Sequence, residues 1–472
     1  MDRTSLYRTI WRWHFYAGLF VMPMVVILAL TGAAYLFKPQ VDAWEERAWR
    51  GLPAATTVSA DQQVKAALAA FPGSRLHSYR LPRAERDAAL VHITLPDHAM
   101  RDVFVAPDGH VVGSLDPEWR IMQVVHDIHG QLLIGKRGSW IVELAASWAI
   151  VMILSGLYLW WPSGRGLAGV VWPRLGGGRK VLWRDLHAVT GFWVSGLAMV
   201  LLVTGLPWAD VWGSAFKAVR TELGWVKGRQ DWTIGGAPAA AEEHAEHDHG
   251  AMAAMTGAMT GAMPSGMHRM PDGTLMAGPA MSGVSLSEIV AEAKSRHLPF
   301  PVIVTPPGGV QPFGGKRSSA WSVRSDTQNR PLRVSLTFDP MTGREISREV
   351  FADKHLIDRV VGYGVAWHEG QLFGLLNQLI GVATALMLVT MSVTGFVLWR
   401  RRKPADRLGA PPLASVPPRM GGVVVIILVL AALLPLLAIS IVLMLAAEFA
   451  LLRRLPAVAH WLGLQSSRGQ VA

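Results

Sequence analysis

Four histidines at matched positions beside long apolar segments carry the main chemistry that this sequence suggests. A shift of 239 residues places His129 on His368 without a gap, and a shift of 173 residues places His14 on His187. Imidazole is a common metal ligand, and two neutral imidazoles from opposing helices suit the two axial positions of a b-type haem iron. We therefore predict two haem-binding pairs, His14 with His187 and His129 with His368.

A single histidine beside a membrane usually only caps a helix or reaches toward water, so the ligand hypothesis depends on the duplication. Polar groups within spans are mostly functional, and here they recur in register. His126 has no duplicate, because Val365 occupies the equivalent position. We expect His126 to have a supporting or structural role, although it is an alternative to His129 as the ligand.

Small residues recur at the far ends of the same segments. Thr31-Gly32 is duplicated by Thr204-Gly205, and Ser155-Gly156 by Thr394-Gly395. Thr31 lies about 17 residues after His14, which is roughly 26 Å along a helix. We expect these glycines to let a flat macrocycle or a neighbouring backbone come close.

The composition indicates a membrane protein. Of the 472 residues 51% are hydrophobic and 17% are charged, which is too apolar for most soluble chains of this size. Spanning a bilayer takes about 20 mainly apolar residues. Five segments meet this requirement, at about 15–37, 140–161, 188–208, 375–399 and 422–447.

The duplication predicts a repeated unit of one span, a small outer domain and a second span. Each outer region has a capping-box start, at Ser59 and at Ser285, followed by alternating strand segments and Gly-containing hairpin turns. Two such units can be related by a two-fold axis along the membrane normal, so that equivalent histidines face each other. The predicted fold class is a membrane α-helical bundle of about five spans with two small α+β outer domains.

These patterns divide the chain into eleven consecutive segments. The transmembrane helices and the segments that carry histidines fall within 1–38, 121–162, 187–208, 356–400 and 422–448. The two α+β domains are expected at 39–120 and 285–355. The loops, the linker and the tail take the rest, at 163–186, 209–284, 401–421 and 449–472.

Basic residues set the expected orientation. Lys and Arg concentrate at the N-terminus and in the loops near 162–182 and 400–407, which predicts a cytoplasmic N-terminus and outer domains on the opposite side. Arg453 and Arg454 fit this topology poorly. The net charge of +11 therefore reflects membrane orientation, and we expect no nucleic-acid partner.

Cysteine is absent. This excludes disulfides, thiolate zinc sites, iron–sulfur clusters and c-type haem attachment.

A segment rich in histidine and methionine follows the third span and has no counterpart in the first unit. Thioethers favour Cu(I), and imidazole accepts divalent ions, so this segment is a candidate copper-binding loop; a flexible insertion without function is the alternative. The candidate ligands are His244, His247, His249, Met252, Met255, Met259, Met263, Met267, His268 and Met270.

The sequence HDIHGQLLIG at 126–135, a following span that ends SGLYLWWP, and the stretches WRWHFYAG and LHAVTGFW together resemble the PepSY-associated transmembrane family. The outer domains look like PepSY domains. The resemblance implies a bacterial inner-membrane protein with periplasmic outer domains. It also implies relatives that hold two haems and reduce ferric siderophores, some with a fused flavodoxin-reductase module.

The expected function is a di-haem b protein that carries electrons across the membrane. Its acceptor would be a ferric siderophore or another Fe(III) chelate, with Cu(II) as an alternative, and no residue is expected to act in acid–base catalysis. No nucleotide-binding βαβ unit is apparent, so we expect a separate electron donor. The rival hypothesis is a haem-free membrane protein that binds a partner or sequesters copper through the His/Met segment.

Overall fold

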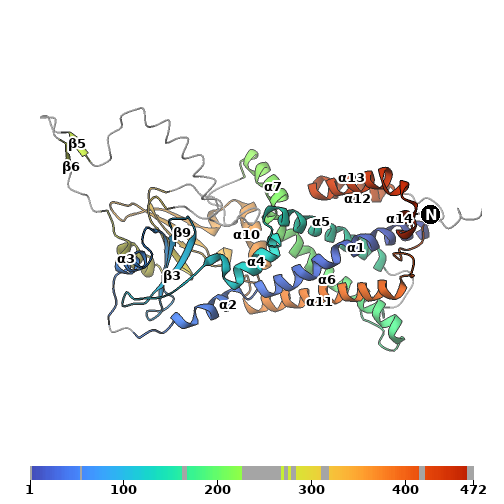
Figure 1. The fold of residues 1–472 in the computed structure, drawn as a ribbon, viewed down its shortest axis with the longest axis horizontal. Helices are drawn as coiled ribbons and strands as arrows, with labels where there is room; N and C mark the ends of the chain where they lie inside the picture. The colour runs from blue at the N-terminus through green and yellow to red at the C-terminus, as the bar shows by residue number, and fades with distance from the viewer. Residues whose placement is uncertain are drawn as a thin grey trace, which may run out of the picture.

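The computed structural model places a β-sheet domain at one end of a bundle of long helices, and the N-terminus lies at the opposite end of the bundle (Figure 1). We call these two ends of the bundle the sheet end and the N-terminal end. The structure describes residues 3–53, 56–161, 167–225, 267–269, 275–277, 283–309, 318–413 and 420–464.

Four helices form the bundle, and each is long and apolar enough to cross a membrane. They are α1 (Arg3–Tyr35), α5 (Lys136–Trp160), α6 (Gly178–Gly205) and α11 (Leu375–Arg402). α1 and α6 run toward the sheet end, α5 and α11 run back, and every helix packs against both neighbours of opposite direction. The prediction of a membrane helical bundle is therefore confirmed.

The fifth predicted span does not form one helix. It folds as α12 (Gly421–Leu433) and α13 (Pro435–Ala450), each shorter than the roughly 20 residues that a span requires. Leu434 leaves the helical conformation (φ −127°, ψ 87°) because the residue before a proline is sterically disfavoured in a helix. α12 and α13 run side by side along the bundle as a hairpin (Figure 1). Its open end lies at the N-terminal end, and its turn packs on α7 (Asp210–Glu222), where Nε1 of Trp212 donates to the carbonyl of Leu433 (3.0 Å).

The chain after the hairpin returns to the start of α1. The short helix α14 (Pro456–Trp461) ends beside α1. After it, the carbonyl of Gly463 accepts a hydrogen bond from Arg12 (3.0 Å), and the carbonyl of Leu462 accepts one from Tyr16. The segment after α11 is joined to the same place, because the amide of Leu408 donates to the carbonyl of Trp461 (2.9 Å). The Arg-rich segment after α11 and the C-terminal segment thus meet at one end of the bundle.

Two shorter helices carry the histidines of the sheet end: α4 (Ile121–Gln131) and α10 (Leu356–His368). Each turns sharply into a bundle helix through an equivalent glycine. Gly135 (φ 62°, ψ −141°) precedes α5, and Gly374 (φ 58°, ψ −136°) precedes α11. Only glycine adopts this region without steric cost, which explains why the duplicated sequence keeps glycine at both positions.

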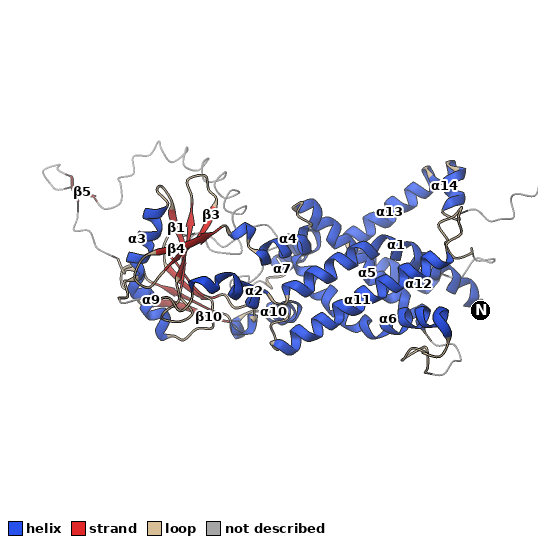
Figure 2. Cartoon of the chain, turned by 60° about the horizontal axis from the view of Figure 1, so that its bottom comes forward, coloured by secondary structure: helices blue, strands red, loops and turns tan. Residues whose placement is uncertain are grey.

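One continuous eight-stranded antiparallel sheet forms the domain outside the bundle (Figure 2). Its order is β10-β9-β8-β7-β1-β2-β3-β4. The first half contains β1 (Arg75–Arg80), β2 (Ala89–Thr94), β3 (Met100–Val105) and β4 (Val111–Leu115). The second half contains β7 (Val302–Thr305), β8 (Trp321–Ser325), β9 (Val334–Phe338) and β10 (Glu345–Val350).

The two halves meet at equivalent positions, as a two-fold axis requires. β1 pairs with β7 through Tyr79 and Val304. Helices α3 (Ala60–Ala70) and α9 (Leu286–Ser295) begin with the predicted capping boxes and pack on one shared core. Asp61 and Ser287 occupy equivalent places, two residues after each cap, and each accepts from the other's backbone amide (3.0 and 3.1 Å). The duplication is therefore visible in the tertiary structure.

The remaining elements connect these parts. They are α2 (Lys38–Glu45), η1 (Glu46–Trp49), η2 (Pro117–Trp119), η3 (Leu206–Trp208), α7 (Asp210–Glu222), η4 (Arg330–Leu332), η5 (Phe351–Asp353), η6 (Leu452–Arg454) and the short strands β5 (Met267–Arg269) and β6 (Leu275–Ala277).

The hairpin predicts where the C-terminal segment lies. The natural chain has no cysteine, so single cysteines can be introduced at the exposed positions Asp406, Ala457 and Arg75. In sealed proteoliposomes of uniform orientation, Asp406→Cys and Ala457→Cys should react with a membrane-impermeant maleimide from one side, and Arg75→Cys only from the other. Labelling of Asp406→Cys and Ala457→Cys from opposite sides would instead establish a fifth span.

Candidate functional site

Two histidine pairs lie at two depths of the bundle. At the sheet end the ring centres of His129 and His368 are 6.3 Å apart, with an angle of 72° between the ring planes. Toward the N-terminal end, His14 of α1 and His187 of α6 line the same cavity. The structure thus brings together the residues that the duplication predicts to be paired; their role as ligands stays a prediction.

Each imidazole is fixed through Nδ1 by a hydroxyl side chain on the neighbouring bundle helix. At the sheet end, the hydroxyl oxygen of Thr31 lies 3.0 Å from Nδ1 of His129, and that of Thr204 lies 3.2 Å from Nδ1 of His368. Toward the N-terminal end, the hydroxyl oxygen of Ser155 lies 2.9 Å from Nδ1 of His14, and that of Thr394 lies 3.2 Å from Nδ1 of His187. Each hydroxyl donates its own proton to the carbonyl four residues earlier, at 2.7–2.8 Å. It therefore accepts from Nδ1–H of the histidine.

This arrangement determines the tautomer. His187 and His368 also have a backbone carbonyl 3.0 Å from Nδ1, from Met391 and Leu201 respectively, and a carbonyl can only accept. With the proton on Nδ1, the lone pair remains on Nε2, the nitrogen that a metal would bind. All four histidines share this state.

The duplicated glycines make room for the imidazole rings. A Cβ on Gly32 would lie 3.0 Å from Cε1 of His129, and a Cβ on Gly205 would lie 3.1 Å from Cε1 of His368. The corresponding distances at Gly156 and Gly395 are both 3.2 Å, to His14 and His187. The nearest protein group at each of these glycines is therefore a histidine ring; that they also admit a macrocycle stays a prediction.

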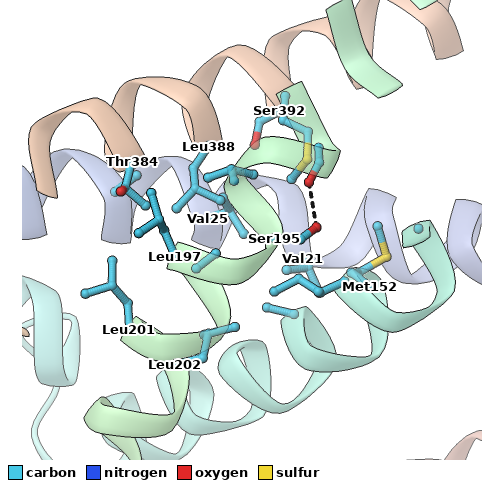
Figure 3. Close-up of a pocket in the computed structure, with 18 of the residues that line it drawn as sticks. Val21, Val25, Met152, Ser195, Leu197, Leu201, Leu202, Thr384, Leu388 and Ser392 are labelled. Atoms are coloured by element: carbon cyan, nitrogen blue, oxygen red, sulfur yellow. Dashed lines mark hydrogen bonds between the residues drawn. The ribbon is translucent and has the colours of Figure 1, made fainter. Parts of the chain in front are cut away.

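One apolar cavity of ≈ 1530 Å³ connects the two pairs. Small-molecule sites usually measure about 300–1,000 Å³, so this cavity has room for more than one cofactor-sized group. Its middle is lined mainly by aliphatic side chains from α1, α6 and α11, including Val21, Val25, Leu197, Leu201 and Leu388 (Figure 3). The hydroxyl side chains of Ser195, Thr384 and Ser392 lie among them. Such a lining suits a mainly apolar occupant.

These residues fit a haem on three observations. An imidazole nitrogen lies about 2 Å from a bound metal such as zinc, so two axial rings would have centres roughly 6 Å apart, close to the distance seen for His129 and His368. Ring pairs without a metal also occur at such distances, so the distance is only the first observation. The second is the Nε2 atoms that are left free to bind a metal, and the third is the size of the cavity. Haem iron needs only two protein ligands.

No group of three or more His, Cys, Asp or Glu side chains that could hold a bare metal ion occurs in the described part of the chain. Among the described residues, neither histidine pair is part of such a group.

Burial keeps the pair at the sheet end neutral. Removal from water lowers the pKa of His129 to about 3, with a further contribution from the neighbouring His368, and it lowers the pKa of His368 to about 4. Both residues lie outside the four spans. Neutral imidazole is the form that binds a metal, so this pair is available as ligands near neutral pH.

His126 lines the same cavity as His129 and His368. Its ring lies 5.6 Å from that of Tyr35, and its Nδ1 lies 3.1 Å from a carboxylate oxygen of Asp127. Its side chain is 41% exposed. Its role, supporting or as an alternative ligand, stays a prediction.

The predicted copper ligands lie largely outside the described residues. This applies to His244, His247, His249, Met252, Met255, Met259, Met263 and Met270. Met267 and His268 belong to strand β5, of which the structure describes the backbone. Copper binding by this segment stays a prediction.

Sequence reasoning missed the role of one set of residues at this site and missed another set entirely. The first set is the four hydroxyl residues, whose duplication is visible in the sequence because a Ser or Thr precedes each duplicated glycine, but whose bond to histidine is not. The second is the buried ion pair of Arg330 with Glu369, beside His368. No local signal identifies Arg330, because it reaches the cavity from η4, in the loop between β8 and β9.

The four bundle helices, together with the shorter helices α4 and α10 that carry His129 and His368, define a class of membrane protein. Comparison with known families identifies that class. Residues 11–402 match the model of the PepSY-associated TM region. The chain belongs to this family. A search of curated proteins found no match.

The contact at Gly32 can be tested with a matched control. Gly32→Val should displace the ring of His129 and remove one haem per chain, because a Cβ would lie 3.0 Å from that ring. Gly196→Val adds the same side chain to a helix position with no atom within 4 Å and should leave haem content unchanged. Haem per chain is measured by the pyridine haemochrome spectrum. Equal content in both variants would contradict the site.

Proposed function

We propose that this protein is an inner-membrane di-haem b protein that carries electrons across the membrane to reduce a metal complex on the side of the sheet domain. The observation that supports it most directly is the repeated construction of the two histidine pairs, each with Nε2 free and Nδ1 held. When bound, haem would supply one-electron redox chemistry at two depths of the bundle.

The residues of the chain have three tasks in this proposal. His14 and His187 would hold one haem, and His129 and His368 the other. The hydroxyl groups orient the imidazoles and raise their basicity as ligands. The mainly apolar middle of the cavity is a low-dielectric region, so a charge at one pair would be screened from the other less than in water.

The position of the second pair supports the side on which the acceptor would bind. His129 and His368 lie on helices next to the sheet domain, so the acceptor would bind on that side. It would be a ferric siderophore or another Fe(III) chelate, as the family resemblance implies, with Cu(II) as the alternative. Arg400, Arg401 and Arg402 lie in the last turn of α11, at the opposite end. The rule that positive loops stay in the cytoplasm therefore supports a periplasmic sheet domain. A separate donor would supply electrons at the N-terminal end.

The stoichiometry is the first test. Protein purified from cells with an adequate haem supply should contain two b-type haems per chain, because there are two matched pairs. Haem quantitation together with the optical spectrum checks this. One haem or none would overturn the proposal, and a protein without haem would favour the rival function of partner or copper binding.

The pairing is the second test. His14→Ala and His187→Ala should remove the same haem, and His129→Ala and His368→Ala should remove the other. Redox titration distinguishes the two, since each haem has its own midpoint potential. If His14→Ala and His129→Ala removed the same haem, the proposed pairs would be wrong.

A further inference from the structure

A buried arginine from the sheet domain reaches the cavity that holds the histidines. Arg330 belongs to η4 (Arg330–Leu332), between β8 and β9, and is only 6% exposed. It lines the same cavity as His129 and His368. A guanidinium is always charged and is rarely buried without acceptors for its N–H groups.

The present partners of Arg330 do not use all of its donors. One Nη donates to Oε1 of Glu369 at 3.0 Å, while Nε of Arg330 and Oε2 of Glu369 are buried with no hydrogen-bond partner among the described residues. A buried polar atom without a partner costs about 1–3 kcal/mol. The unpartnered Nε–H therefore indicates that another acceptor belongs beside it.

The surrounding charges indicate that this acceptor is an anion. Asp326 is shared by Arg324 (3.5 Å) and Arg333 (3.1 Å), and Glu369 is the partner of Arg330. Burial alone would raise the pKa of Asp326, but Arg324, Arg333, Arg330 and Lys38 together lower it below its usual value. Asp326 is therefore ionised and is already shared by two other guanidinium groups. A guanidinium forms its strongest hydrogen bonds with an ionised acceptor, so a further anion would complement Arg330.

We propose that Arg330 binds a carboxylate of the planar group held between His129 and His368. This inference rests on the proposed function, because a b-type haem carries two propionate carboxylates on one edge. The position of Arg330 then orients that edge toward the sheet domain and leaves the apolar edge toward the middle of the cavity. Guanidinium and carboxylate form charge-assisted hydrogen bonds that are stronger than neutral ones.

The test compares haem with its dimethyl ester, which has the same ring and iron but no carboxylate charge. Full-length apoprotein carrying His14→Ala, so that only the sheet-end pair is intact, is placed in nanodiscs and titrated with each compound by absorbance. The parent should bind haem about tenfold or more tightly than the ester, as expected for one charge-assisted hydrogen bond. Arg330→Gln should lower haem affinity to that of the ester and leave ester affinity unchanged.

The matched control is Arg333→Gln. Arg333 lies in the same loop and is similarly buried, with 7% exposure, but it does not line the cavity. This variant should keep the preference for haem over the ester. The assignment would be overturned if Arg330→Gln preferred haem over the ester as strongly as the parent does. It would also be overturned if the parent showed no preference for haem over the ester.

A further variant covers the case in which Arg330→Gln does not fold. Glu369→Gln removes the carboxylate that competes for Arg330, so the preference for haem over the ester should increase. An unchanged or smaller preference would contradict the inference. If neither compound binds the parent protein, the proposed function itself fails, and that outcome is distinct from equal binding of both.

Discussion

The hydrogen bond between each imidazole Nδ1 and a hydroxyl on the adjacent helix is the constraint on which the site depends. A histidine alone can rotate, and either nitrogen can carry the proton. At Thr31 and its three counterparts the hydroxyl already donates to its own helix, so it can only accept from the histidine. The adjacent glycine allows the ring close enough for this bond. Helix packing, ring orientation and tautomer are therefore fixed together.

Ion pairs with little exposure to water join the sheet domain to both histidine-bearing helices at the sheet end. Just after α10, Glu369 pairs with Arg330 of η4, in the loop between β8 and β9. Just before α4, Arg120 pairs with Glu46 (2.8 Å) and with Asp102 of β3 (3.6 Å). Removing one member of a buried pair leaves an uncompensated charge, which is strongly destabilising. Each unit thus couples its half of the sheet to its histidine through charged side chains.

The two-fold arrangement explains how one chain builds two similar sites. Pairing of β1 with β7 joins the two halves into one sheet, and Asp61 with Ser287 fixes the helices on its face. The same relation places α1 opposite α6 and α5 opposite α11. The C-terminal hairpin lies outside this symmetry. Its break before Pro435 returns the chain to the N-terminal end, which removes the conflict between the basic residues near 453 and a fifth span.

The sequence alone determined the apolar helices, the duplication and the histidine pairs, because a period of apolar residues and a gap-free repeat are local properties of the chain. It also determined the capping boxes at Ser59 and Ser285. Only the tertiary structure decided that the fifth apolar segment is a hairpin, because a proline is compatible with a kinked span or a complete turn. Only the tertiary structure brought Arg330 to Glu369, the residue after His368, because that contact joins residues 39 positions apart through the packing of η4 on α10.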